Sequence, residues 1–514
     1  MDLQFITSTN VIYINIDSQQ FLSEAKYIFQ FFFTVLGIKK IQIVSQVESL
    51  SGIIVYYGRE HRSASRGKFI IHIADADYYK KYDSPQVSSG IKCTKSMQNL
   101  PINLKYIFSK KLAGLKDVWY KEEKNKSSLV TSSENAIHCN IDIVSSSFYL
   151  LNLENERLCD GRDNLDRFQK SHAKMGNAVY ENPIVDQLLL LFDAFLKRAH
   201  GSVNHTHLYS IWPQNCTFAL ALSHDVDRLR TWTYSKAKRV LKESGGNKEF
   251  DRLLKKSVEV FYSISLKNNW SGNFAYITQL EKRYRANSTF FFASKRRSLQ
   301  DPKYKLGWKR IRSGFGKIIQ NNSQIGLHGT FLSFKNGDFL NEEKTILEKS
   351  INTNIKGFRQ HYLRFDIQGT FDAIAHARFK YDSTLGFSDD LGYRCGTSLP
   401  YFPFNPREKN AYSFLEIPLI LMDTVLFLES KLNLSSVKAW EFVEKHLKLA
   451  HESGFCLTIN WHNNNINTAD VFGYAKLYEK ILEWAFEKNA WICSLDDLYD
   501  WWIQKIELLR MEEN

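Results

Sequence analysis

Several polar residues in the second half of the chain occur at or just after short apolar segments, and all but one of them, an arginine, can bind a metal or transfer a proton. These residues are His224, Asp225, Asp227, His328, Arg359, His361 and His462. Imidazole nitrogens and carboxylate oxygens are the usual protein ligands of zinc and similar divalent ions. The same groups serve as general acids and bases. The residue types therefore indicate metal-assisted or acid–base chemistry, provided that the fold brings them together.

The elements that must position these residues are short strands that alternate with helices. Strands are predicted at residues 218–223, 288–292, 324–327, 356–359, 415–418, 456–461 and 491–494. Helices are predicted at residues 275–285, 342–351, 434–452 and 474–488. Repeated strand–helix units imply parallel strands, in a doubly wound sheet or a closed barrel. In both arrangements catalytic groups gather at the carboxyl ends of the strands, where the seven polar residues occur.

The preceding part of the chain, residues 1–205, is predicted to be a separate and smaller α/β domain. Its β-rich runs are residues 11–16, 41–44, 52–57 and 69–73, and helical patterns occur at 145–156 and 183–198. Its histidines are scattered singly, so no site is predicted there and its role is unknown. Gly, Ser, Asn and Pro cluster at residues 199–215, and a domain boundary is expected in that segment.

Composition limits the classes of protein that the chain could be. The 514 residues carry a formal net charge of +13, but the basic residues alternate with acidic ones and accompany no nucleic-acid-binding motif, so no nucleic-acid partner is expected. The seven cysteines include no C-x-x-C pair, which argues against a disulfide framework or a thiolate zinc site. Neither a signal peptide nor an apolar run long enough to span a bilayer is recognisable. A cytoplasmic protein without a membrane span is therefore expected.

The sequence contains six motifs, in this order: SHDVD, IGLHG, GFRQHY, YDSTLGF, LEIPL and NWHNN. Their order and spacing resemble those of the polysaccharide deacetylase family, also known as the NodB-homology or carbohydrate esterase family 4 domain. The resemblance covers residues 206–514. The chain as a whole is similar to a bacterial type in which an N-terminal domain of uncharacterised function precedes the deacetylase domain. The resemblance implies a distorted (β/α) barrel after the smaller α/β domain, and one divalent metal ion, with zinc as the expected metal.

Catalytic roles are implied by this resemblance position by position. Asp225 matches the family's general base, and Arg359 matches the arginine that holds this base. Tyr362 matches the residue whose backbone N–H stabilises the oxyanion, and His462 matches the general acid. Asp382, in YDSTLGF, resembles the aspartate that supports the acid histidine.

The metal ligands implied by the family are one aspartate and two histidines, and the chain departs from that pattern. Asp227 and His328 match two of the ligands, but Leu332 occupies the place of the second histidine in the family's H-x-x-x-H motif. His361 is the expected replacement, because it stands where the family has the proline of its R-x-P-Y motif. His224 is the alternative third ligand.

Together these matches predict a hydrolase that removes an acetyl group from a glycan or sugar intermediate, with an N-acetyl group preferred over an O-acetyl group. The expected partner is an acetylated carbohydrate. Two alternatives stay open: the same fold could hydrolyse a small non-peptide amide, or the loss of a ligand at Leu332 could leave a catalytically weak glycan-binding or scaffold protein. The presence of Asp225, Asp227, Arg359 and His462 argues against the scaffold alternative.

Overall fold

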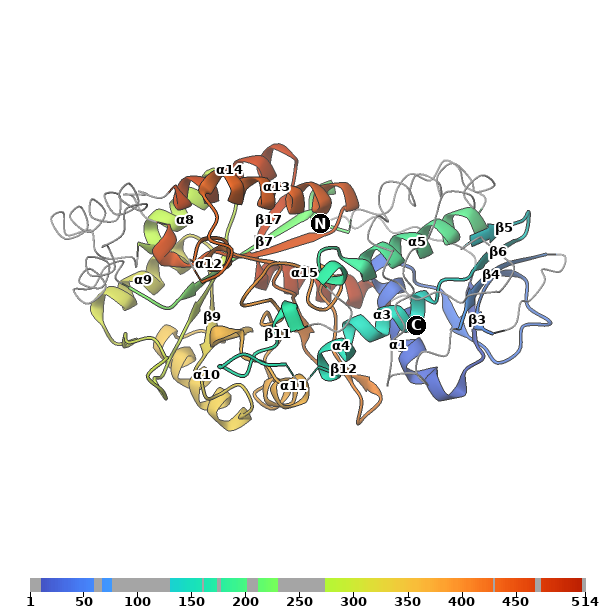
Figure 1. Cartoon of the computed structure of the whole chain (residues 1–514), viewed down its shortest axis with the longest axis horizontal. Coiled ribbons are helices and arrows are strands. Elements are labelled where there is room, and N and C mark those ends of the chain that lie inside the picture. Colours follow the sequence, from blue (N-terminus) through green and yellow to red (C-terminus); the bar gives the residue numbers. More distant parts are fainter. Residues whose placement is uncertain are drawn as a thin grey trace.

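The computed structural model describes residues 11–59, 67–75, 130–159, 161–172, 177–200, 211–229, 273–428, 430–466 and 473–510. Two large β-sheets with their helices lie side by side along the longest axis of the molecule (Figure 1). All strands of one sheet come from before residue 140, and all strands of the other come from after residue 218. The segment at which a domain boundary is expected lies partly outside the described residues, and the boundary stays a prediction.

The N-terminal sheet has six strands in the order β2-β1-β3-β4-β6-β5. They are β1 (Ile12–Ile16), β2 (Ile41–Ile43), β3 (Gly52–Gly58), β4 (Lys68–Ala74), β5 (Val130–Ser132) and β6 (Ala136–Cys139). All pairs are parallel except β5 with β6. The accompanying helices are η1 (Gln19–Phe21), α1 (Leu22–Leu36), α3 (Ile143–Leu151), α4 (Glu154–Arg157), η5 (Lys170–His172), η6 (Asn177–Tyr180) and α5 (Ile184–Ala199). The sequences of β3 and β4, GIIVYYG and KFIIHIA, are almost continuously apolar, as in parallel strands that are covered on both faces.

The C-terminal sheet has nine strands, and all of its pairings are parallel. They are β7 (Ala219–Val226), β8 (Thr289–Phe292), β9 (Gln324–Gly329), β10 (Gly357–Gln360), β11 (Tyr381–Asp382), β14 (Leu415–Glu416), β15 (Leu421–Met422), β16 (Cys456–Asn460) and β17 (Trp491–Ser494). Strand β7 is buried along its whole length. It pairs with β16, with β17 along its first half and with β8 along its second half.

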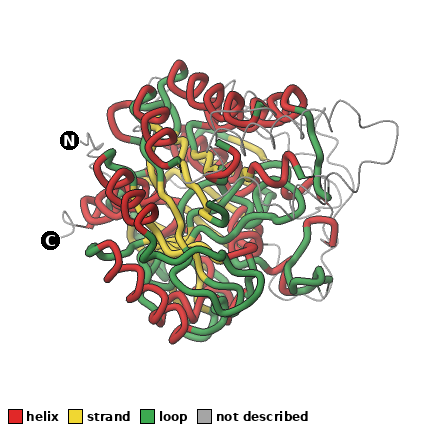
Figure 2. Tube along the Cα trace, turned by 90° about the vertical axis from the view of Figure 1, so that its left-hand side faces the viewer, coloured by secondary structure: helices red, strands yellow, loops and turns green. Residues whose placement is uncertain are grey.

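Helices surround this sheet, so that its strands lie in the middle of the molecule (Figure 2). They are η7 (Pro213–Asn215), α8 (Phe274–Arg283), α9 (Lys309–Gln320), α10 (Gly337–Ile351), η8 (His361–Leu363), α11 (Ile367–His376), α12 (Asp423–Phe427), α13 (Ser436–Ser453), η9 (Asn463–Asn465), α14 (Tyr474–Glu487) and α15 (Leu495–Arg510). A short hairpin of β12 (Phe404–Asn405) and β13 (Asn410–Ala411) stands apart from the sheet.

The prediction of an α/β chain with parallel strands is confirmed, and the sheet curls as a barrel does. Within the described residues, however, no pairing joins β14 to β15, the strands at the two ends of its path. The chain between them crosses the gap: the Ile417 N–H donates to Asp382 O and the Ile420 N–H donates to Thr458 O. The sheet is therefore a partly open barrel.

The two halves of the chain share a buried interface. One continuous set of buried apolar side chains contains residues from both. Arg394 donates two hydrogen bonds to Glu156, of 3.0 and 2.6 Å, and both side chains are almost fully buried. On another part of the interface, the buried Lys505 of α15 donates a bond of 2.7 Å to Val35 O near the end of α1. The N-terminal half is thus packed against the barrel through apolar and polar contacts.

No described helix combines the length and the apolar character needed to cross a membrane.

Candidate metal and catalytic site

The carboxyl ends of β7, β9, β10 and β16 bring the predicted polar residues to one edge of the C-terminal sheet. Asp227 follows β7 directly, and His328 is the penultimate residue of β9. His361 follows β10, and His462 follows β16 after one intervening residue. Parallel strands carry their carboxyl ends to the same side, so residues far apart in the sequence become neighbours.

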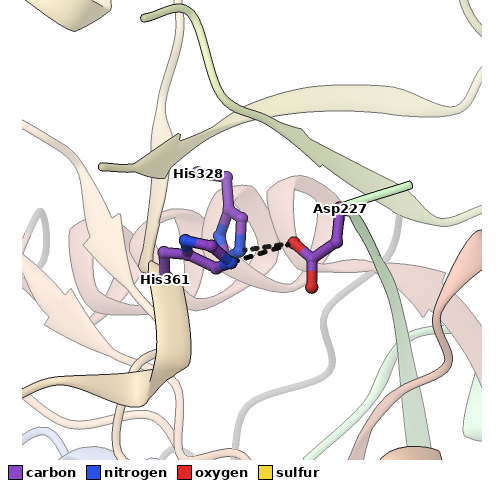
Figure 3. Close-up of side chains that lie close together, drawn as sticks. All are labelled: Asp227, His328 and His361. Carbon is purple, nitrogen blue, oxygen red and sulfur yellow. Dashed lines mark ion pairs between the residues drawn. The ribbon is translucent and has the colours of Figure 1, made fainter. Parts of the chain in front are cut away.

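Asp227, His328 and His361 form a cluster that could hold a metal ion. One ligand atom from each lies within 4.8 Å of the others. Asp227 Oδ1 is 3.3 Å from His328 Nε2 and 3.5 Å from His361 Nε2, and both imidazole rings face this oxygen (Figure 3). Ligand atoms bonded at about 2.1 Å to a tetrahedral zinc ion are roughly 3.4 Å apart. The spacing and the oxygen–nitrogen donor set therefore fit a zinc-like ion.

His328 is oriented for such a role by the backbone. Its Nδ1 lies 3.0 Å from Arg359 O, an atom that can only accept a hydrogen bond. Nδ1 therefore carries the hydrogen, and the neutral ring presents the lone pair of Nε2 to the cluster. Burial lowers the pKa of His328, but the carboxylates of Asp225 and Asp227 outweigh burial and raise it.

A carboxylate that the sequence analysis missed stands behind His361. Asp301 Oδ1 lies 3.6 Å from His361 Nδ1, on the side of the ring away from Asp227. Asp301 is fixed in turn, because it accepts backbone hydrogen bonds from Arg297, Ser298 and Phe331. Burial raises the pKa of Asp301, but His361 and these donors lower it to about 2. The two atoms are too far apart for a hydrogen bond, but the negative charge beside Nδ1 makes Nε2, the nitrogen that faces Asp227, more basic.

Asp301→Asn is expected to weaken metal binding without removing a ligand. The amide keeps the shape of the side chain but loses the negative charge beside His361 Nδ1. Loss of a partner of this kind costs about 10–100-fold in metal affinity. Competition titration with Zn²⁺ and a chromophoric chelator would measure the change. A Zn²⁺ affinity equal to that of the unaltered protein would show that Asp301 only accepts backbone hydrogen bonds and does not influence metal binding.

Asp225 lies beside the candidate ligand cluster as a buried, ionised group. Its Oδ1 accepts a bond of 3.0 Å from Arg359 Nη1, and its Oδ2 accepts a bond of 2.8 Å from Asn460 Nδ2. Burial raises the pKa of Asp225, but Arg359, His328 and His462 outweigh it and the net shift is downward. The structure thus places Arg359 against Asp225, as predicted, and adds Asn460, which the sequence analysis did not single out.

The residue that supports His462 is Asp423 rather than the predicted Asp382. Asp423 Oδ1 lies 2.6 Å from His462 Nδ1, and Asp423 Oδ2 accepts a bond of 2.9 Å from the His462 backbone N–H. His462 Nε2 then faces the cluster, 3.6 Å from Asp227 Oδ2. Burial lowers the pKa of His462, but Asp423 and Asp227 raise it well above the usual value. The expectation for Asp382 is therefore corrected.

Asp382 takes part in a different arrangement. It lies on β11 opposite Glu416 of β14, and both side chains are fully buried. Asp382 Oδ1 accepts a bond of 2.5 Å from Thr384 Oγ1. Burial raises the pKa of Asp382 to about 6, and burial together with Asp382 raises the pKa of Glu416 well above its usual value. These two carboxyl groups join neighbouring strands of the barrel and do not contact His462.

His224 is not a metal ligand in this structure, although it was the alternative candidate. Its Nδ1 lies 2.6 Å from Trp461 O and its Nε2 lies 2.8 Å from Glu281 Oε1. Both ring nitrogens are therefore engaged away from the cluster. Glu281 also accepts hydrogen bonds from Ser288 and Tyr478. His224 thus ties β7 to α8 and to the end of β16.

Tyr362 and Leu332, two further positions of the family motifs, are both exposed. Tyr362 follows His361 with φ 63° and ψ 8°, and its side chain is 39% exposed. Its role as an oxyanion donor stays a prediction. Leu332, at the position of the missing family histidine, is 48% exposed and supplies no ligand atom. His361 joins Asp227 and His328 instead.

The N-terminal half matches a family model. Residues 13–201 match a family described as a family of unknown function (DUF7033). The matched segment is less than half of the chain. A search of curated proteins finds no match.

Distant similarities to solved structures are found for the chain. A probable polysaccharide deacetylase from Pseudomonas aeruginosa PAO1 is 16% identical, with a TM-score of 0.40, over 57% of this chain and 94% of that one. The PuuE allantoinase is 17% identical, with a TM-score of 0.39, over 57% of this chain and 92% of that one. Values this low do not establish an activity, so the function is inferred from the side chains of the site.

Proposed function

We propose that the C-terminal half is a metal-dependent hydrolase that removes an acetyl group, an N-acetyl group rather than an O-acetyl group, from a glycan or sugar intermediate. One observation supports this proposal above the others. A candidate metal cluster, an ionised carboxylate and a carboxylate-held imidazole all lie at one edge of the same sheet. Asp225 Oδ2 is 4.0 Å from His328 Nε2, and His462 Nε2 is 3.6 Å from Asp227 Oδ2.

Asp225 fits the role of general base. Its charge is maintained by Arg359, so it stays ionised and can accept a proton from water. Its position beside the ligand atoms of His328 and Asp227 puts that water next to the cluster. A divalent ion at Asp227, His328 and His361 would polarise the acetyl carbonyl and lower the pKa of the attacking water.

His462 fits the role of general acid. Asp423 accepts the hydrogen bond from Nδ1, and the proton on Nε2 faces the cluster. When the C–N bond of the acetamide breaks, this proton can pass to the departing nitrogen. Tyr362 is proposed to donate its backbone N–H to the developing oxyanion, because donors directed at that oxygen stabilise the transition state.

The alternative of a catalytically weak glycan-binding or scaffold protein requires that the site lacks a metal ligand or a catalytic residue. The presence of Leu332 where the family has a ligand histidine would support the scaffold alternative only if no other side chain supplied the third ligand. His361 occupies a position 3.5 Å from Asp227, while base, acid and their partners are all retained. Hydrolysis of a small non-peptide amide uses the same groups and becomes the preferred conclusion if metal binds but no acetylated sugar is cleaved.

His361→Ala tests the proposed ligand set. Loss of a direct ligand should weaken Zn²⁺ binding by more than the roughly 10–100-fold cost of losing a supporting residue. Calorimetric titration with Zn²⁺ would measure the affinity, and chelation followed by Zn²⁺ addition should remove and restore hydrolysis of acetylated chitooligosaccharides. His376→Ala is the matched control, because His376 is exposed and pairs only with Asp338 in the described part of the chain. Equal Zn²⁺ affinities for the two variants would refute the three-ligand site.

A further inference from the structure

We propose that the N-terminal half completes this active site, and that Arg167 is a positioning residue for Tyr362. The proposal rests on the proposed function, in which the backbone at Tyr362 faces the reacting carbonyl. It gives a specific task to residues 161–170, which belong to the part of the chain that matches the family of unknown function.

The backbone turn that follows His361 has a conformation that surrounding contacts must hold. Tyr362 and Leu363 have φ values of 63° and 54°, so two successive residues with side chains adopt the left-handed conformation. L-residues rarely do so, and such turns persist only where surrounding contacts hold them. The turn immediately follows His361, whose Nε2 faces Asp227.

Arg167 supplies one of these contacts. Its Nη1 donates a bond of 3.1 Å to Tyr362 O, and its guanidinium lies 6.0 Å from the centre of the Tyr362 ring. Asp163 holds the rest of the guanidinium: its Oδ2 accepts a bond of 2.8 Å from Arg167 Nε and forms an ion pair with Nη2 at 2.7 Å. Asp163 also accepts the backbone N–H groups of Leu165 and Arg167. Arg167 is therefore held in place before it reaches Tyr362.

A second contact holds the other end of the turn. Arg364 donates a bond of 3.0 Å from Nε to Leu165 O, and a bond of 2.7 Å from Nη1 to Phe331 O. Its guanidinium stacks over the Phe331 ring at 4.1 Å. The turn at 362–363 is thus clamped between two arginines, one from each half of the chain, and both clamps involve residues 161–170.

This segment is itself anchored to the barrel. The buried Lys170 pairs with Asp390 at 3.0 Å and donates to Leu391 O at 3.3 Å. Close by, Glu156 accepts both bonds from Arg394. A segment fixed at its end in this way can transmit a rigid constraint to Tyr362. The N-terminal half then contributes to turnover without touching the substrate.

Arg167→Ala in the full chain is expected to lower kcat for 4-nitrophenyl acetate and for acetylated chitooligosaccharides, with KM and Zn²⁺ affinity unchanged. A small displacement of a positioned group costs up to about 10²-fold in rate. Arg167→Lys should recover part of the loss, because a lysine keeps the positive charge and a donor for Tyr362 O but lacks the planar guanidinium that contacts Asp163 and Tyr362 at once. Arg157→Ala is the matched control, since Arg157 lies in the same half and pairs with Glu154 only within the described residues.

Hydrogen exchange of the peptide that contains residues 361–364 gives a readout independent of activity. Exchange should be faster in Arg167→Ala than in Arg157→Ala, with equal melting temperatures. Equal exchange and equal kcat in these two variants would overturn the proposal. If the unaltered protein bound Zn²⁺ but hydrolysed neither probe, the proposed function would fail. The exchange rates would then still decide whether Arg167 holds the turn.

Discussion

Asp225→Asn is expected to remove nearly all hydrolysis while the protein still binds Zn²⁺. The amide cannot accept a proton from water, and a positioned general base contributes roughly 10²–10⁴-fold to the rate. The ligand set of Asp227, His328 and His361 is untouched by the substitution. Measurement of kcat on acetylated chitooligosaccharides, with Zn²⁺ affinity determined on the same preparation, separates the two effects.

The same substitution should also reduce stability, because Arg359 is completely buried and Asp225 neutralises it. Removing one partner of a buried ion pair costs about 3–5 kcal/mol. Thermal unfolding should therefore be recorded first, and kinetics measured well below the transition. Asp338→Asn, which changes an exposed aspartate, is the control for the substitution itself. Normal turnover in folded, Zn²⁺-loaded Asp225→Asn would assign the base to another residue.

His462→Ala should slow the cleavage of N-acetyl groups by about 10²–10⁴-fold, the usual contribution of a positioned acid. A much smaller effect is expected for 4-nitrophenyl acetate, whose leaving group departs without protonation. The variant therefore changes the ratio of the two activities as well as their size. Asp423→Asn should shift that ratio in the same direction, because Asp423 holds His462 Nδ1 at 2.6 Å.

Two controls sharpen this test. Asp382→Asn should leave the ratio of the two activities unchanged, since Asp382 bonds to Thr384 and lies opposite Glu416. His376→Ala should change neither activity. If His462→Ala lowered ester and amide hydrolysis equally, His462 would be acting on the attacking water or on the fold rather than on the leaving group.

Much of the barrel could be predicted from the sequence because its strands are short apolar runs that end in polar residues. The predicted segments 456–461 and 491–494 correspond closely to β16 and β17. The segment 415–418 was less well predicted. It contains β14, only two residues long, and the chain then passes to β15 without a helix between them. Such short strands have no periodicity, and tertiary contacts rather than local pattern define them.

The same reason explains the errors at the site. Asp423 follows β15 directly, so it lies at the carboxyl end of a strand, where catalytic residues are expected. The two-residue strand β15 is not predicted from the sequence, and Asp423 is therefore missed. Asp382 also ends a strand, and nothing in the sequence shows that its carboxyl group faces Glu416 instead of His462. Asp301 lies in an irregular segment between β8 and α9, where no local signal marks its approach to His361.

The buried pair of Glu156 and Arg394 has a consequence for cooperativity. Separating the two halves of the chain would expose a desolvated ion pair together with apolar surface from one continuous core. Opening at this interface would then cost a large part of the free energy of global unfolding, and the two halves would form one cooperative unit. Hinge motion between the two halves is therefore expected to be a high-energy event, because it would break this pair and divide the core.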